Sequence, residues 1–140
     1  LSVPLLHTVW TGTKFKIGDT EYSLDDVENK VLRRKFEEPR IHFAINCASM
    51  SCPPLRNEAF TGERVQEQLD DQARNFINNP RYNKITKDQA ELSKIFSWFS
   101  GDFKKHGTLI EFINQYSKVK LDAEADLSYM DYDWSLNEQK

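Results

Sequence analysis

His42, Cys47 and Cys52 lie close together in the sequence and carry the most reactive side chains of their region. A thiol paired with an imidazole base is a common nucleophile in acyl transfer and amide hydrolysis. If residues 41–46 form a strand, His42 and Cys47 lie about 17 Å apart, so Cys52, beyond a flexible loop, is the better partner. The pattern therefore suggests a cysteine-dependent hydrolase or acyltransferase, with Cys52 as nucleophile, His42 as base and Glu28 as an orienting group.

The residue after Cys52 argues against this chemistry. Pro53 has no backbone N–H to donate to an oxyanion. A residue before proline also disfavours the helical conformation, so Cys52 does not easily begin a helix that would lower its thiol pKa. The plainer interpretation is that His42 is a hydrogen-bonded strand residue and that Cys47 is a small buried hydrophobe.

The two cysteines also suggest a second alternative, a thiol–disulfide redox protein. Cys47 and Cys52 are separated by four residues, whereas thioredoxin-like motifs have two. The intervening residues are small enough for a disulfide to close. Two cysteines fit a local disulfide in an exported protein and free thiols in a reducing compartment.

The interpretation that we favour is a ligand- or peptide-binding module built on the loop of residues 47–57. Its Pro53-Pro54 pair stiffens the chain and lowers the entropy lost when the loop is ordered. The residues expected to bind a small molecule or peptide are Cys47, Ser49, Ser51 and Arg56. Trp134, which lies between polar residues, is a further candidate for a binding platform, whereas Trp98 and the other aromatic residues are expected mostly in the core.

Neither a metal site nor a cofactor site is expected. Cys47, Cys52 and His42 could supply three zinc ligands, but zinc sites usually contain a second closely spaced pair. The acidic stretch of residues 122–133 resembles a calcium loop, yet Leu127 stands where an EF-hand loop needs glycine.

Composition limits the partners that this chain could have. Its 140 residues suit a single domain spanning residues 1–140. The net charge is −3, and the 19 basic and 22 acidic residues are interspersed, so no basic stripe exists to bind nucleic acid. No apolar run approaches the roughly 20 residues of a membrane-spanning helix. The chain does not begin with Met, and we expect any export signal to lie outside it.

The pattern of apolar residues predicts helices in four places. Residues 23–35 and 61–78 carry apolar stripes at helical spacing, with Ser23 and Thr61 as the expected N-caps. Two shorter helices are expected after Ser93 and Thr108, which are also good N-cap residues.

Strands are predicted between these helices. Residues 14–17 and 20–22 read as a hairpin around Gly18, and residues 82–85 and 89–92 as a second hairpin. Residues 41–46 and 129–136 alternate as strands do. Because helices and strands are mixed without regular alternation, we expect an α+β fold, with a mixed or antiparallel sheet flanked by several helices.

Five segments, taken together, resemble the Domain of Unknown Function 547 family. They are Tyr-Ser-Leu-Asp-Asp-Val-Glu (22–28) with Leu-Arg (32–33), Arg-Ile-His-Phe-Ala-Ile-Asn (40–46), Ser-Cys-Pro-Pro-Leu (51–55), Leu-Ser-Lys-Ile-Phe-Ser-Trp (92–98) with Asp-Phe (102–103), and Tyr-Asp-Trp-Ser-Leu-Asn (132–137). Family members carry an upstream helix rich in Asn and Tyr that this chain lacks, so it is similar to the later part of the family domain. The family brings no established activity. Its bacterial members often look exported, which implies a periplasmic or extracellular location.

Overall fold

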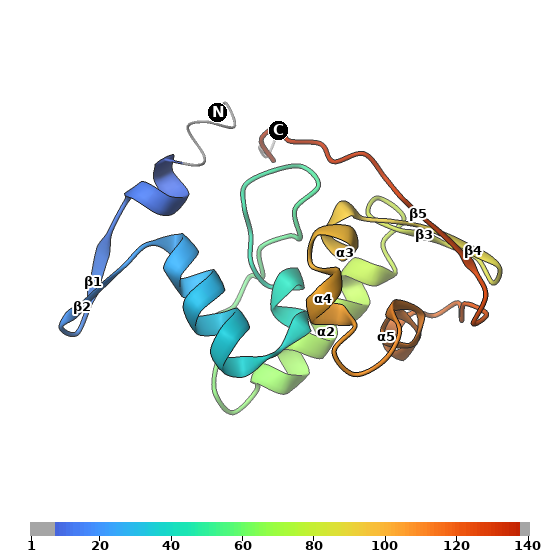
Figure 1. Cartoon of the computed structure of the whole chain (residues 1–140), viewed down its shortest axis with the longest axis horizontal. Coiled ribbons are helices and arrows are strands. Elements are labelled where there is room, and N and C mark those ends of the chain that lie inside the picture. The colour runs from blue at the N-terminus through green and yellow to red at the C-terminus, as the bar shows by residue number, and fades with distance from the viewer. Residues whose placement is uncertain (1–7, 138–140) are drawn as a thin grey trace.

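The computed structural model describes residues 8–137 as a mixture of helices and small sheets. The described part begins with the short helix η1 (Thr8–Gly12) and the strands β1 (Phe15–Ile17) and β2 (Thr20–Tyr22). The helices η2 (Asp26–Phe36) and η3 (Pro39–Phe43) follow. Figure 1 shows β1, β2 and η2 at one end of the molecule and a three-stranded sheet at the other, with the α-helices between them. The α+β class expected from the sequence is therefore confirmed.

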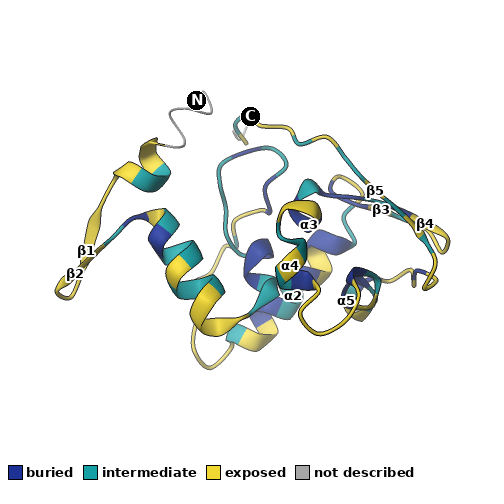
Figure 2. Cartoon of the chain, in the orientation of Figure 1, coloured by how far each residue is buried: buried dark blue, intermediate teal, exposed yellow. Residues whose placement is uncertain are grey.

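The helices α2 to α5 surround one hydrophobic core. Their bounds are α2 (Val65–Ile77), α3 (Lys94–Trp98), α4 (Ser100–Phe103) and α5 (Leu109–Tyr116). Phe43 is fully buried at 0% exposure, and its ring contacts the rings of Phe76, Phe96, Phe103 and Phe112. In Figure 2 the buried residues gather in these helices and in the adjoining strand, whereas β1 and β2 are exposed.

The larger sheet has the order β3–β4–β5. Strands β3 (Lys84–Ile85) and β4 (Gln89–Leu92) form the expected antiparallel hairpin, and β5 (Asp126–Tyr129) pairs with β4 in parallel. The strand expected over residues 129–136 is thus misplaced, because β5 ends at Tyr129. Beyond it the chain runs beside the loop of residues 48–51, with an isolated bridge between Ser49 and Leu136 and backbone hydrogen bonds from the Met50 and Ser51 N–H groups.

The strand expected over residues 41–46 is wrong. Residues Pro39–Phe43 form the short 3₁₀ helix η3, with Pro39 in its first turn and the Glu38 side chain accepting a hydrogen bond from the Arg40 N–H. Ile41, His42 and Phe43 are all buried, at 7%, 4% and 0% exposure. A short run buried on every side has no periodicity that distinguishes a strand from a helical turn.

Of the four expected capping residues, three accept a hydrogen bond from a backbone N–H at the start of their helix, and one does not. Ser23 Oγ accepts from the Asp26 N–H. Ser93 Oγ accepts from the Ile95 N–H, and Thr108 forms a capping box with Glu111. Thr61 does not cap α2, since that helix begins only at Val65 and has no side-chain cap. Instead, the Thr61 N–H donates to Gln68 Oε1 and so holds the preceding loop against the helix.

Candidate functional site

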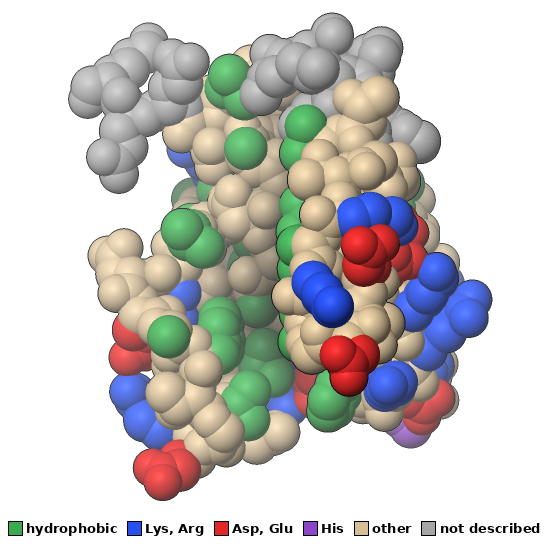
Figure 3. Space-filling view, turned by 90° about the vertical axis from the view of Figure 1, so that its left-hand side faces the viewer, with side chains coloured by type: hydrophobic (Ala, Val, Ile, Leu, Met, Phe, Trp, Pro, Cys, Tyr) green, Lys and Arg blue, Asp and Glu red, His purple; other side chains and the backbone are tan. Residues whose placement is uncertain are grey.

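A cleft of about 380 Å³ opens where three segments of the chain meet. The first segment contains η1 and η2, the second contains η3 and the loop that follows it, and the third combines α3 with the chain after β5. The lining residues are Trp10, Thr11, Asp25, Glu28, His42, Ile45, Cys47, Cys52, Pro53, Ile95, Trp98, Phe99, Tyr132 and Trp134. Figure 3, which views the molecule from the side of β1, β2 and η2, shows hydrophobic side chains gathered in a hollow between two walls.

The first turn of η2 is fixed by reciprocal hydrogen bonds. Ser23 Oγ accepts from the Asp26 N–H at 3.1 Å, and Asp26 Oδ2 accepts from the Ser23 N–H at 2.9 Å. Hydrogen bonds from Lys30, Ser23 and Lys14 hold the pKa of Asp26 well below its usual range. This capped turn positions Asp25 and Glu28 at the cleft.

His42 reaches the cleft from η3 and is held by Asp102 of α4. The distance from His42 Nε2 to Asp102 Oδ2 is 2.8 Å, and the same oxygen accepts from Arg33 Nε at 2.7 Å. The His42 ring also stacks on Phe99, with ring centroids 3.9 Å apart and planes at 17°. The Arg33 guanidinium lies 5.0 Å from the centre of the same Phe99 ring.

These contacts set the protonation states of the pair. Burial lowers the pKa of His42, against the opposing effect of the Asp102 hydrogen bond, so the imidazole is neutral at pH 7. Burial alone would raise the pKa of Asp102, but hydrogen bonds from Arg33 and His42 outweigh it and lower that pKa. An ionised carboxylate only accepts, so His42 Nε2 donates and Nδ1 is the unprotonated nitrogen that a general base needs.

The loop after η3 is closed by a disulfide between Cys47 and Cys52, whose Cα atoms lie 6.0 Å apart. Asn46 braces this loop from both ends, accepting from the Ala48 N–H and donating to the Pro53 carbonyl, each at 2.9 Å. Ala48 adopts the left-handed conformation, with φ at 61°. The disulfide and Pro53 thus present a fixed edge to the cleft.

The chain after β5 is joined to the same loop. Ser49 Oγ and Tyr132 Oη lie 2.8 Å apart, and Ser51 Oγ accepts from the Asp133 N–H at 2.9 Å. Because Ser49 is only 2% exposed, its hydroxyl is engaged in the hydrogen bond with Tyr132. Ser49 and Ser51 therefore support the lining of the cleft from behind.

Three aromatic rings form a cluster at the cleft. The ring centroids of Trp98 and Tyr132 are 4.7 Å apart, those of Tyr132 and Trp134 4.5 Å, and those of Trp98 and Trp134 5.7 Å. Trp98 and Trp134 remain 48% and 47% exposed. Trp98 is therefore not the core residue expected from its helical spacing.

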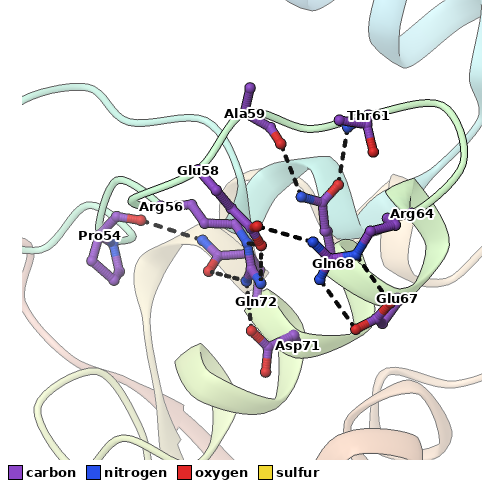
Figure 4. Close-up of polar contacts among 10 residues, drawn as sticks. All are labelled: Pro54, Arg56, Glu58, Ala59, Thr61, Arg64, Glu67, Gln68, Asp71 and Gln72. Atoms are coloured by element: carbon purple, nitrogen blue, oxygen red, sulfur yellow. Dashed lines mark hydrogen bonds and ion pairs between the residues drawn. The ribbon is translucent and has the colours of Figure 1, made fainter.

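Of the predicted site residues, Glu28, His42, Cys47 and Cys52 are brought together at the cleft. Arg56 is not among the lining residues; it pairs with Glu58 and Asp71. Figure 4 shows the surrounding loop, in which Gln68 and Gln72 of α2 bind backbone groups of residues 54–61. These contacts hold Arg56 in a polar network beside α2 that is separate from the cleft.

The group that holds His42 is Asp102, where the sequence suggested Glu28. Asp102 lies sixty residues from His42 along the chain, and no local pattern links them. Its only signal was the Asp-Phe pair at residues 102–103, which is part of the family resemblance. Glu28 makes no hydrogen bond or ion pair within residues 8–137.

Two classes of site are not found in the part of the chain that the structure describes. No group of three or more His, Cys, Asp or Glu side chains within residues 8–137 could hold a metal ion. Over the same residues, no helix has both the length and the hydropathy needed to cross a membrane.

The fold and the cleft define a small α+β protein with an aromatic-lined, disulfide-edged cleft. The chain belongs to the family described as protein of unknown function, DUF547, whose sequence model matches residues 4–77. No curated protein and no solved structure matches the chain. Because the function of the family is unknown, function has to be inferred from the cleft.

Proposed function

We propose that this chain is a binding module whose cleft holds the apolar part of a small ligand or peptide. The observation that carries the proposal is the exposure of Trp98 and Trp134, at 48% and 47%, beside a cleft of about 380 Å³. Small-molecule sites are typically concave and mostly apolar, with a few polar groups, and have volumes of about 300–1,000 Å³. Exposed aromatic groups gathered in one concave place mark a binding surface.

The rigidity of the cleft also supports binding. The Cys47–Cys52 disulfide fixes one edge, and the Ser49–Tyr132 hydrogen bond joins this edge to the aromatic cluster. A preformed site loses little conformational entropy when it takes up a ligand, so more of the contact energy appears as affinity.

The test is a screen of small aromatic and aliphatic fragments by ligand-observed NMR, with binding confirmed by tryptophan fluorescence. Fragments that bind the wild-type chain should bind Trp98→Ala about tenfold more weakly, since an aromatic anchor in a binding pocket typically contributes more than 1 kcal/mol. The matched control is Phe60→Ala, which removes an aromatic residue of 37% exposure outside the cleft. Fragments that bind both variants as well as they bind wild type would contradict the proposal.

A second candidate function is a cysteine-dependent hydrolase or acyltransferase. It is favoured by one observation: His42, held by Asp102 at 2.8 Å, lines the same cleft as Cys52. Cys52 would act as nucleophile after reduction of its disulfide, with His42 as base. The absence of an N–H on Pro53 still weighs against an oxyanion hole at that residue.

Alkylation with iodoacetamide after reduction tests this candidate. An activated Cys52 should label well below the ordinary thiol pKa of about 8.5, and His42→Ala should abolish the fast labelling. Equal and slow labelling of Cys47 and Cys52 would exclude it.

The third candidate is a thiol–disulfide redox protein, supported by the disulfide between Cys47 and Cys52 at the cleft. The reduction potential of this disulfide, measured in glutathione buffers, distinguishes a structural role from a redox-active one. A structural disulfide should resist reduction, with a potential below about −300 mV, whereas a redox-active one should titrate within the buffer range.

A disulfide also suits an oxidising compartment, and we propose on this ground that the protein is exported. A fully reduced pair of cysteines in protein isolated from its native cells would contradict export.

A further inference from the structure

The carboxylates of the cleft differ from their neighbours in lacking a cationic partner. Asp26 is paired with Lys14 and Lys30 outside the cleft. Within residues 8–137, Glu28 makes no hydrogen bond or ion pair, and Asp25 accepts only from the neutral amide of Asn29, at 2.9 Å. Two negative charges thus border the cleft without a direct ionic partner among the described residues, although Arg33 attracts Glu28 through space and opposes the rise that burial causes in the pKa of Glu28.

No basic side chain of the lining offsets these charges. The lining contains neither Lys nor Arg, and its one imidazole, that of His42, is neutral because burial lowers its pKa. Burial raises the pKa of Glu28, which reflects the cost of keeping its charge beside apolar groups. A carboxylate in such surroundings gains most when it pairs with a cation.

The aromatic cluster favours the same charge. The rings of Trp98, Tyr132 and Trp134 gather at the cleft. The face of an aromatic ring carries negative partial charge, and tryptophan is the best aromatic partner for a cation. The cleft therefore has two independent features, carboxylates without a direct ionic partner and a cluster of aromatic rings, that both attract positive charge and both disfavour an anion.

We propose that the ligand of this cleft is a small organic cation, an ammonium or amidinium-type group carried on an apolar body. The charged group would lie at Glu28, and the apolar body against Trp98 and Trp134. The volume of about 380 Å³ suits a small molecule. This inference rests on the proposed binding function and assigns it a ligand class by charge complementarity.

The test compares three probes that share a 2-phenylethyl group and differ in charge: 2-phenylethylammonium, neutral 2-phenylethanol and anionic 3-phenylpropanoate. Dissociation constants are measured by NMR titration against the wild-type chain and three variants, Glu28→Gln, Glu124→Gln and Trp98→Ala. Glu124 is the matched control, because it is an exposed carboxylate outside the cleft.

We expect the cation to bind at least about tenfold more tightly than the alcohol, since a charge-assisted hydrogen bond is about twice as strong as one between neutral groups. Glu28→Gln should abolish this preference and leave the affinity for the alcohol unchanged, while Glu124→Gln should change neither. Trp98→Ala should weaken both probes.

The outcomes separate the two proposals. If the alcohol or the anion binds as tightly as the cation, and Glu28→Gln alters nothing, the cation inference is overturned while the binding function stands. If no probe binds at millimolar concentration, both are overturned.

Discussion

The hydrogen bond between His42 and Asp102 makes a prediction that tests how η3 and α4 are joined. His42→Phe keeps a ring against Phe99 and removes the donor, and Asp102→Ala removes the acceptor. Each single variant leaves its partner without this contact, while the double variant removes both groups. The coupling free energy from such a double-mutant cycle reports the contact itself.

The structure sets the expected size of this coupling. A hydrogen bond to a charged group contributes about 1.5–3 kcal/mol. The His42 side chain is only 2% exposed, but that of Asp102 is 23% exposed and keeps Arg33 as a partner. Water and Arg33 therefore compensate in part, and we expect a coupling of about 1–2 kcal/mol.

Urea unfolding followed by tryptophan fluorescence measures the free energies, at a pH where His42 is neutral. The control cycle uses Lys84 and Glu91, whose side chains form an ion pair of the same length, 2.8 Å, but are 61% and 43% exposed. Its coupling should be about 0.2–1 kcal/mol and should fall with added salt. A His42–Asp102 coupling no larger than this control would refute the reasoning.

Three further predictions concern stability, each measured by urea unfolding. Phe43 is 0% exposed, so Phe43→Ala leaves a cavity at the centre of the core and should lower the free energy of unfolding by about 3–5 kcal/mol. Phe36 is 66% exposed, so Phe36→Ala should change that free energy by no more than about 0.5 kcal/mol. Equal effects of the two variants would contradict the assigned core. Burial lowers the folded-state pKa of His42 below its ordinary value of 6.5, so the unfolded chain binds a proton more readily than the folded chain. The stability that the neutral His42 provides is therefore complete above pH 6.5 and is lost as the pH falls towards the folded-state pKa. His42→Phe should flatten this dependence; an unchanged slope in His42→Phe would assign the dependence to other groups. Thr108→Ala breaks the capping box and should cost about 1 kcal/mol; no loss would mean that water replaces the cap.

Much of the fold could be predicted because its signals are local. The hairpin turn at Gly18 and the caps at Ser93 and Thr108 depend on residues within four positions of one another, and all form as expected. The helical stripe of residues 61–78 also predicted α2, apart from its first turn. There the contact of Thr61 with Gln68, seven residues away, replaced the expected cap.

The candidate site was predicted only in part. Glu28, His42, Cys47 and Cys52 were identified by residue type and do line one cleft. Their geometry was not predictable, because the segment carrying His42 was expected to be a strand and is a 3₁₀ helix. Apolar residues that are buried on all sides leave no alternation from which to choose between the two.

By itself, the sequence determined the α+β class, most of the helices and hairpins, and the family resemblance, because each depends on composition or on contacts between near neighbours. Only the tertiary structure decided that Asp102 holds His42, that Arg56 pairs with Asp71 outside the cleft, and that Trp98 and Trp134 meet beside the Cys47–Cys52 disulfide. These contacts join residues that are distant in the chain. They form only when the whole core packs and offsets the entropy cost of closing the loops between them.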